Sequence, residues 1–314
     1  MTTAFLFPGQ GSQAVGMGKA LAEAYPAARA VFAEVDDALG EPLSRIIWDG
    51  PLDKLTLTEN AQPALMAVSL AIMRVLTLTK GVQLAAMVAF VAGHSLGEYS
   101  ALAAAGAFTL ADTARLLRLR GKAMQAAVPV GQGAMAALLG IDAEGARKAV
   151  AEAAQDDVCQ VANDNDPGQV VISGSKAAVE RAGEIAKKYG AKRAMMLNVS
   201  APFHCLLMQP AAAAMREALA GVTIHRPAVP VVANVLAAAT QDPGEIAKRL
   251  VEQVTGTVRW RESVAFMAAQ GVTHVYEIGA GKVLCGLAKR IVPSLEARPV
   301  GTPEEIEAVA ALLG

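Results

Sequence analysis

A serine between two glycines is the clearest sign of chemistry in the chain. Gly93-His94-Ser95-Leu96-Gly97 fits the G-x-S-x-G pattern, in which a sharp turn between a strand and a helix exposes a serine hydroxyl. An apolar run over 88–91 precedes the pattern and a helical stretch over 96–105 follows it. This context predicts that Ser95 is a nucleophile. The structural alternative is a glycine-lined tight turn that carries an ordinary serine.

A nucleophilic serine needs a base, and the chain has four histidines. His94 adjoins Ser95, and adjacent side chains at such a turn point apart. His225 falls in a predicted loop, and His274 falls in a strand pattern that favours a structural role. His204 lies at a break between a strand and a helix, where sheet enzymes place catalytic groups. The residues alone favour His204 as the base and leave the choice open.

One arginine falls on the apolar face of a predicted helix that starts after Thr109. On a helical wheel, Arg115, Arg118 and Lys122 share one face. Arg120 lies elsewhere, among apolar residues, where a guanidinium is costly unless an anion meets it. The partner is either an internal Asp or Glu or a substrate carboxylate, which a planar guanidinium binds with two hydrogen bonds. A third interpretation is that the aliphatic part of the Arg120 side chain is buried while its guanidinium reaches water.

The elements around these residues indicate an α/β fold. An apolar strand-like run over 4–7 is followed by a helical segment over 17–39, and a second helical pattern has Pro63 as its first residue. The apolar run over 82–92 is typical of a buried strand. Such runs alternating with helices predict a parallel sheet covered by helices on both faces.

The middle of the chain predicts a separate unit. Strand patterns cover 134–140, 158–162, 169–173 and 192–199, with helical patterns over 142–155 and 176–189 and a loop over 163–168. The order β-α-β-β-α-β is that of a ferredoxin-like unit. We therefore expect an inserted ferredoxin-like subdomain over 127–197, within a larger α/β catalytic domain made of 1–126 and 198–314. A last helix is predicted over 303–313.

Composition excludes several classes of protein. Of 314 residues, 54% are hydrophobic, which excludes a disordered chain, and the formal net charge of −1 provides no general attraction for nucleic acid or an anionic membrane. No uninterrupted apolar run reaches ~18 residues, so we expect no membrane span. Three scattered cysteines form no metal-binding pattern, and no secretory signal is apparent. A cytoplasmic enzyme without a metal is expected.

Several motifs in order give the chain a family resemblance over nearly its whole length. The chain resembles the malonyl-coenzyme A:acyl carrier protein transacylases, which are related to the acyltransferase domains of fatty acid and polyketide synthases. The fold this implies is a hydrolase-like parallel-sheet domain with an inserted ferredoxin-like domain. The motifs are Phe7-Pro8-Gly9-Gln10-Gly11-Ser12-Gln13, Gly93-His94-Ser95-Leu96-Gly97-Glu98-Tyr99, Arg120-Gly121-Lys122-Ala123-Met124-Gln125, Pro167-Gly168-Gln169-Val170-Val171-Ile172, Val199-Ser200-Ala201-Pro202-Phe203-His204 and Glu277-Ile278-Gly279-Ala280-Gly281-Lys282.

The resemblance implies a role for each matching residue. Ser95 corresponds to the nucleophile, His204 to the base and Arg120 to the partner of the malonyl carboxylate. The backbone N–H groups of Gln10 and Leu96 correspond to the oxyanion hole. These implied roles agree with the serine, the histidine and the buried arginine that the residue patterns select.

Three further positions follow from the same resemblance. Gln253 is implied to lie near His204, where its backbone carbonyl orients the imidazole ring. Ala280 departs from the family pattern, because many relatives have proline between the two glycines, and we expect this to change local rigidity only. Leu96 and Phe203 resemble malonyl-preferring members more than methylmalonyl-preferring ones.

The implied activity is transfer of a malonyl group from coenzyme A to the phosphopantetheine thiol of acyl carrier protein. A malonyl-serine ester is the intermediate, kinetics are ping-pong, malonyl-coenzyme A is the substrate, and no cofactor is bound. We expect a monomer. The alternatives are a serine thioesterase or hydrolase, an acyltransferase for another carboxyacyl group in polyketide synthesis, and a docking subunit with a vestigial site.

A basic cluster is the predicted docking point for the carrier protein, which the family implies to be acidic. Lys187, Lys188, Lys192 and Arg193 fall together at the end of the last helix of the predicted insertion and in the strand that follows. A solvated face without a partner is the alternative.

Overall fold

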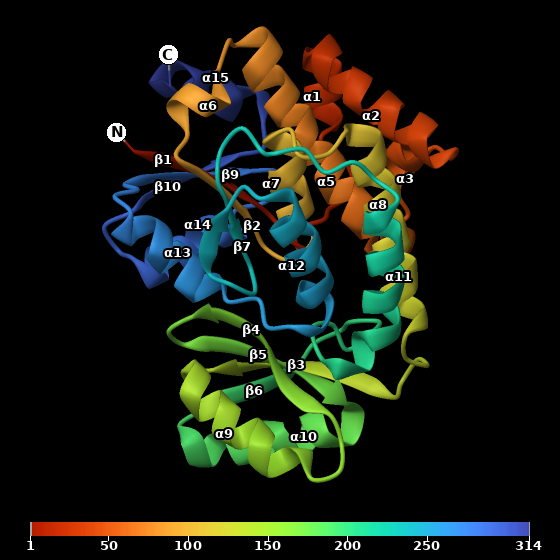
Figure 1. Cartoon of the computed structure of the whole chain (residues 1–314), viewed down its shortest axis with the longest axis vertical. Helices are drawn as coiled ribbons and strands as arrows, with labels where there is room; N and C mark the ends of the chain where they lie inside the picture. Colours follow the sequence, from red (N-terminus) through yellow and green to blue (C-terminus); the bar gives the residue numbers. More distant parts are fainter. Residues whose placement is uncertain (1, 314) are drawn as a thin grey trace.

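The computed structural model describes residues 2–313 and places two sheets one below the other (Figure 1). In the larger sheet the strand order is β10-β9-β1-β2-β7-β8. Its pairs are parallel except for the edge strand β8, which runs antiparallel to β7. Its strands are β1 (Thr3–Phe7), β2 (Phe90–Gly93), β7 (Val231–Ala233), β8 (Ala238–Thr240), β9 (His274–Ile278) and β10 (Glu296–Val300).

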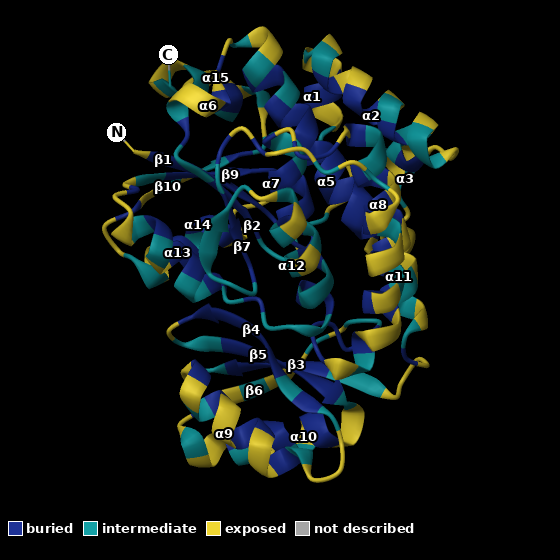
Figure 2. Ribbon diagram, viewed as in Figure 1, coloured by how far each residue is buried: buried dark blue, intermediate teal, exposed yellow. Residues whose placement is uncertain are grey.

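Helices cover both faces of this sheet, which explains why its central strands are apolar throughout. All five residues of β1 are buried. Phe5 and Phe7 pack into one core with the helices α2, α5, α7, α8 and α11, whereas Ala4 and Leu6 pack into another with α13 and α14. The central strands are therefore buried on both sides, while the outer faces of the surrounding helices are exposed (Figure 2).

The large domain contains most of the helices. In chain order they are α1 (Lys19–Ala24), α2 (Pro26–Leu39), α3 (Leu43–Asp49), α4 (Leu52–Thr56), α5 (Thr58–Arg74), the π-helical turn η1 (Val75–Thr79), α6 (Leu84–Met87), α7 (Gly97–Ala104), α8 (Leu110–Ala126), the short 3₁₀ helix η3 (Leu206–Met208), α11 (Gln209–Ala220), α12 (Pro243–Thr255), α13 (Trp260–Ala269), α14 (Val283–Ile291) and α15 (Pro303–Leu313).

Two helix predictions near the N-terminus need correction. The single helix expected over 17–39 is two helices, because Tyr25 is extended and Pro26 starts the second one. The helix expected to begin at Pro63 begins at Thr58 and contains the proline. Pro63 has no N–H to donate to the carbonyl four residues earlier, and Nη1 of Arg118 donates to that carbonyl of Glu59 instead, at 2.7 Å. The interior proline is accommodated because a buried arginine replaces its missing donor.

The strand expected over 82–92 is also shorter than its apolar pattern. Residues Leu84–Met87 form the helical turn α6, and only Phe90–Gly93 pairs with the sheet. A short apolar run does not by itself distinguish a buried helix from a buried strand.

The smaller sheet is antiparallel, with strand order β4-β5-β3-β6. The helices α9 and α10 pack on it around a separate apolar core. Together with the chain order β-α-β-β-α-β, this strand order confirms the ferredoxin-like arrangement. The exact boundaries at 127 and 197 stay a prediction. The elements are β3 (Gly133–Leu139), α9 (Ala143–Ala154), β4 (Cys159–Asp166), β5 (Gln169–Ser175), α10 (Lys176–Ile185), the 3₁₀ turn η2 (Ala186–Tyr189) and β6 (Arg193–Met196).

The loop predicted over 163–168 is mostly strand. β4 continues to Asp166, and its polar end is held by the large domain. Asp164 is fully buried and accepts hydrogen bonds from Arg261 of α13, and Asp166 pairs with Arg290 of α14 at 2.6 Å. Charged partners from the other domain therefore stabilise a polar sequence as a strand. These contacts tie the two sheets together.

One helical stretch is long and apolar enough to cross a membrane by length and composition. It covers Thr58–Thr79, and 83% of its most apolar window is buried inside the protein. The helices α2, α7 and α8 contact α5, so its apolar side chains belong to the core of the large domain.

Candidate active site

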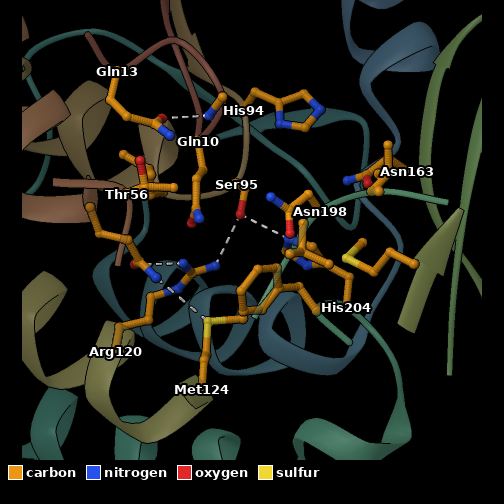
Figure 3. A pocket seen from close by; sticks show the side chains of 17 residues that line it. Gln10, Gln13, Thr56, His94, Ser95, Arg120, Met124, Asn163, Asn198 and His204 are labelled. Carbon is orange, nitrogen blue, oxygen red and sulfur yellow. Dashed lines mark hydrogen bonds between the residues drawn. The ribbon is translucent and has the colours of Figure 1, made fainter. Parts of the chain in front are cut away.

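Ser95 lies on a sharp turn at the carboxyl end of β2 (Figure 3). Its φ angle is 54°, in the left-handed region that non-glycine residues rarely adopt. The turn is tight enough that a Cβ on Gly93 would lie 1.9 Å from the backbone of Gly97. Oδ1 of Asn234 accepts the Ser95 N–H at 2.8 Å and holds the turn from the end of β7. Glycine at both flanking positions thus allows the conformation that exposes the serine hydroxyl.

His204 faces Ser95 directly. Its Nε2 lies 2.8 Å from Oγ of Ser95, and its Nδ1 lies 2.8 Å from the backbone oxygen of Gln253. Because a carbonyl only accepts, Nδ1 carries the hydrogen and Nε2 presents a free lone pair to the serine. Burial, together with the positive charge of Arg120, lowers the pKa of His204 to about 3. The imidazole is therefore neutral at physiological pH.

The other histidines lie in different settings. His94 is partly buried beside Trp260, and its Nε2 lies 2.9 Å from Oδ1 of Asn165. His274, on β9, lies 3.4 Å from a carboxylate oxygen of Glu296, and His225 is exposed. Of the four histidines, His204 is the one that the structure brings within hydrogen-bonding distance of the Ser95 hydroxyl.

Arg120 is almost fully buried, with 1% of its surface exposed, and it points at the serine. Its Nη2 lies 3.1 Å from Oγ of Ser95 and 2.8 Å from Oε1 of Gln253, and its Nη1 donates to Oε1 of Gln62 at 2.7 Å. Within residues 2–313, no carboxylate lies within ion-pair distance of Arg120. Its burial also excludes the interpretation that the guanidinium of Arg120 reaches water. The guanidinium thus has neutral partners and faces the pocket.

Arg118 shares one face of the predicted helix with Arg115 and Lys122, yet it is buried whereas those two are exposed. Only 8% of Arg118 is exposed, and its guanidinium contacts Asn60 and Glu41 besides the Glu59 carbonyl. Two arginines of α8 are therefore buried, and they differ in their partners. Among residues 2–313, a carboxylate pairs with Arg118 and none pairs with Arg120.

Gln10 and Leu96, which line the pocket at Ser95, each have a backbone N–H group without a hydrogen-bond partner among residues 2–313. His94 N donates to the carbonyl of Phe7 at 3.0 Å, which holds the segment after β1 against the turn. Both N–H groups remain available to a ligand oxygen.

The pocket at Ser95 has a volume of about 310 Å³ and is lined by both domains. Gln10, Ser95 and Arg120 line it from the large domain, and Met135 and Asn163 line it from the small sheet. Polar side chains such as His204 line it together with apolar ones such as Phe203. A cavity of this kind, with a few convergent polar groups, is the usual form of a small-molecule site.

Sequence reasoning missed three polar residues that hold the site together. The side-chain oxygen of Gln62 accepts a hydrogen bond from Arg120, and that of Asn234 accepts one from the Ser95 N–H. The carboxylate of Glu98 accepts hydrogen bonds from Asn234 and Gln253. A signal existed for Asn234, a polar residue directly after the buried strand Val231–Ala233. Glu98 and Gln62 each lie on a helix next to apolar or small residues, which is a weak signal of a buried polar contact. No group of three or more metal-binding side chains is found among the residues that the structure describes.

A parallel α/β sheet with a serine on a tight turn and a neutral histidine beside it is the arrangement of serine-dependent acyl-transfer enzymes. Comparisons with known proteins agree. The model of the acyl transferase domain family matches residues 4–300. The chain is 49% identical to the malonyl CoA-acyl carrier protein transacylase of Escherichia coli K12, over 98% of the chain and 99% of that protein.

Solved structures give the same result. The acyl-carrier-protein S-malonyltransferase of Bartonella henselae is 58% identical, with a TM-score of 0.98 and full coverage of both chains. A malonyl-transacylase in complex with a type II PKS acyl-carrier protein is 46% identical, with a TM-score of 0.95 over 99% of this chain and 100% of that one. The chain therefore belongs to the malonyl CoA-acyl carrier protein transacylases of the acyl transferase family, and the resemblance seen in the motifs is confirmed.

Proposed function

We propose that this protein transfers a malonyl group from malonyl-coenzyme A to the phosphopantetheine thiol of an acyl carrier protein, through an ester on Ser95. The observation that carries the proposal is the position of Arg120. A buried guanidinium without a carboxylate partner lies 3.1 Å from the serine hydroxyl, at the place where an acyl group on Ser95 would extend. A terminal carboxylate on that acyl group would supply the missing anion.

In the first half-reaction, His204 acts as the general base. Its neutral Nε2 takes the Ser95 proton as Oγ attacks the thioester carbonyl. The free N–H groups of Gln10 and Leu96 stabilise the oxyanion of the tetrahedral intermediate. His204 then donates the proton to the departing coenzyme A thiolate, which leaves a malonyl ester on the enzyme.

The substrate itself makes His204 a stronger base. The charge of Arg120 contributes to the low pKa of His204, after the larger effect of burial. A malonyl carboxylate on Arg120 offsets that charge, so the pKa of His204 rises when the correct acyl group is bound. Proton transfer is therefore easier with a malonyl group than with a neutral acyl group.

In the second half-reaction, the thiol of the carrier protein replaces coenzyme A. His204 takes the thiol proton, the sulfur attacks the malonyl-serine carbonyl and Oγ of Ser95 leaves as the protonated hydroxyl. The complex of a similar transacylase with an acyl-carrier protein supports this partner. The site is complete within one chain, which supports a monomer as the active unit; its side chains are Ser95, His204, Arg120 and Gln253. No step requires a bound cofactor.

Two experiments distinguish this proposal from its alternatives. Intact-mass analysis after mixing with malonyl-coenzyme A should show a malonyl adduct on the native protein and none on Ser95→Ala, with Ser294→Ala, an exposed serine, as the control that keeps the adduct. An adduct on Ser95→Ala would place the nucleophile elsewhere, and no adduct on the native protein would support a docking subunit. Isolated malonyl-enzyme should then pass its acyl group to carrier protein much faster than to water. Rapid loss to water alone would instead identify a hydrolase.

A further inference from the structure

Glu98 is a buried carboxylate that the proposed mechanism does not use. It lies on α7, one turn after Ser95, and only 2% of its surface is exposed. Its Oε2 accepts hydrogen bonds from the N–H of Asn234 at 3.0 Å and from Nε2 of Gln253 at 2.8 Å. An ionised carboxylate at this depth needs a positive charge nearby, and no direct ion pair supplies one among the described residues.

The nearest positive charge is Arg120, on the other side of the Gln253 side chain. Nε2 of Gln253 donates to Glu98 and to the Ser95 carbonyl, at 2.8 and 3.0 Å, so its oxygen must face the other way. That oxygen accepts from Nη2 of Arg120 at 2.8 Å. One amide therefore separates the carboxylate from the guanidinium and is polarised by both.

With Glu98 ionised, the free site is neutral overall. The charged group that acts on Glu98 is Arg120 from α8. Tyr99, the next residue on the helix of Glu98, is titratable and is itself affected by the charge of Glu98, while α12 and the segment after β7 contribute the neutral side chains of Gln253 and Asn234. Burial raises the pKa of Tyr99, so its hydroxyl keeps its proton. One positive and one negative charge remain. A malonyl carboxylate on Arg120 adds a second negative charge to a buried site.

We propose that Glu98 is the internal counter-charge of Arg120, and that it takes up a proton from solvent when the malonyl carboxylate assumes that role. The proton binds Oε1, because Oε2 already accepts two hydrogen bonds. The buried charge then stays balanced in both states. Glu98 thereby acts on specificity as a positioning residue, through Gln253 and Arg120, and this role rests on the malonyl transfer proposed above.

The titration of Glu98 is consistent with such an exchange. Burial raises the pKa of Glu98 to about 7, against the opposing effects of its two hydrogen bonds and of Arg120. When the malonyl carboxylate offsets the charge of Arg120, one of those opposing effects weakens and the pKa rises further. A group that is half ionised in the free enzyme near pH 7 thus becomes mainly protonated in the complex.

Titration calorimetry on Ser95→Ala tests this without turnover. Malonyl-coenzyme A and acetyl-coenzyme A are compared in buffers of different ionisation enthalpy, so that the difference between them isolates the carboxylate. Malonyl-coenzyme A should take up about half a proton more at pH 7, and its affinity relative to acetyl-coenzyme A should fall roughly five- to tenfold from pH 6 to pH 8.

A second substitution assigns the proton. In Ser95→Ala/Glu98→Gln the proton difference should vanish, and the malonyl preference at pH 8 should rise to its pH 6 level because no competing negative charge remains. The matched control is Ser95→Ala/Glu277→Gln, since Glu277 is also buried with a raised pKa but lies on β9 and does not line the pocket. This control should keep the proton difference.

Each unexpected result would contradict one or both of the proposals. A clear malonyl preference without any proton difference would overturn the role of Glu98 and leave the proposed function intact. A proton difference that persists in the Glu98→Gln variant would assign the proton to another group and also overturn it. Equal affinity for the two thioesters at every pH would overturn the carboxylate-binding role of Arg120, and with it both proposals. If the Glu98→Gln variant does not fold, the pH dependence of proton uptake by Ser95→Ala assigns the proton. Uptake that is largest above pH 7 indicates Glu98, whereas uptake that is largest below pH 6 indicates His204 and overturns the role of Glu98.

Discussion

Oγ of Ser95 lies 2.8 Å from Nε2 of His204, and both residues have positive φ angles, which residues other than glycine rarely adopt. Their φ angles are 54° and 59°. Such conformations cost of order 1–3 kcal/mol each and persist only where surrounding contacts enforce them. Here the Asn234 side chain holds the Ser95 N–H, and the Gln253 carbonyl holds the His204 ring. The hydrogen bond between the two side chains is thus formed by two strained residues.

The strain at Ser95 predicts an effect on stability. Ser95→Gly should be more stable than Ser95→Ala by about 1 kcal/mol, because glycine adopts a positive φ without a steric cost. Urea unfolding of the two variants measures the difference. The control pair is Ser100→Gly and Ser100→Ala, in the interior of α7, where glycine should instead be the less stable residue. The same sign at both positions would show that Ser95 is not strained.

His204→Ala should slow acylation far more than it weakens substrate binding. General base catalysis contributes about 10²–10⁴-fold, and the Ser95 hydroxyl has no second base within reach among the described residues. Single-turnover formation of the malonyl adduct gives the rate, and calorimetry gives the affinity. His225→Ala, which changes an exposed histidine, should behave as the native protein. Near-native acylation by His204→Ala would exclude it as the base.

The low pKa of His204 predicts an unusual pH profile. A histidine with a lowered pKa stays neutral as the pH falls, so an ordinary loss of activity near pH 6.5 should be missing. At limiting malonyl-coenzyme A, the second-order rate constant for acylation should not decline from pH 8 to about pH 5, because it reports the free enzyme, in which the pKa of His204 is about 3. Stopped-flow measurement at each pH tests this. A decline centred near pH 6.5 would mean that His204 titrates like an exposed histidine.

Much of the site was predictable from the sequence because each element there obeys a local rule. The Ser95 turn needs two glycines, and Arg120 interrupts an apolar helix face. The β-α-β-β-α-β order likewise follows from short alternating patterns. These signals lie within a few residues of one another, so periodicity and turn chemistry are enough to detect them.

The remaining contacts were not predictable, because they join residues far apart in the chain. Asn234 binds the Ser95 N–H across 139 residues, and Gln253 binds Arg120 across 133. No local pattern encodes such a pair. The same reason explains the polar end of β4, where Asp164 depends on Arg261, and the burial of Arg118, which depends on Pro63 and Glu59 of another helix. In each case a distant partner overrides the local preference.

Only two of the four basic residues predicted to dock the carrier protein are free of carboxylate partners among residues 2–313. Lys187 pairs with Glu184, and Lys188 pairs with Glu152, whereas Lys192 and Arg193 are exposed and have no carboxylate partner among residues 2–313. Their strand β6 leads directly into Leu197 and Asn198, which line the pocket. The docking prediction therefore rests on Lys192 and Arg193.

Reversing these two charges should raise the KM for an acidic carrier protein and leave the KM for malonyl-coenzyme A unchanged. The variant is Lys192→Glu/Arg193→Glu, and the effect should shrink at high salt because exposed charges are screened. The matched control is Arg147→Glu/Lys148→Glu, which makes the same charge change on the exposed face of α9. An equal rise in both variants would indicate a general charge effect and exclude β6 as the docking site.

Arg120 gives the sharpest test of substrate choice, because its neutral partners leave its charge for the substrate. Arg120→Ala would leave the malonyl carboxylate in a buried site without a partner, which costs about 3–5 kcal/mol, or roughly two to three and a half decades in kcat/KM. With acetyl-coenzyme A, which has no carboxylate, the loss should be small or reversed. Arg120→Lys should recover only part of the malonyl activity, since an ammonium cannot form two parallel hydrogen bonds. The matched control is Arg118→Ala, which removes the neighbouring buried arginine and should lower stability while affecting both substrates alike. If Arg120→Ala also lowered kcat/KM equally for malonyl and acetyl substrates, its guanidinium would have a structural role and the acyl specificity would arise elsewhere.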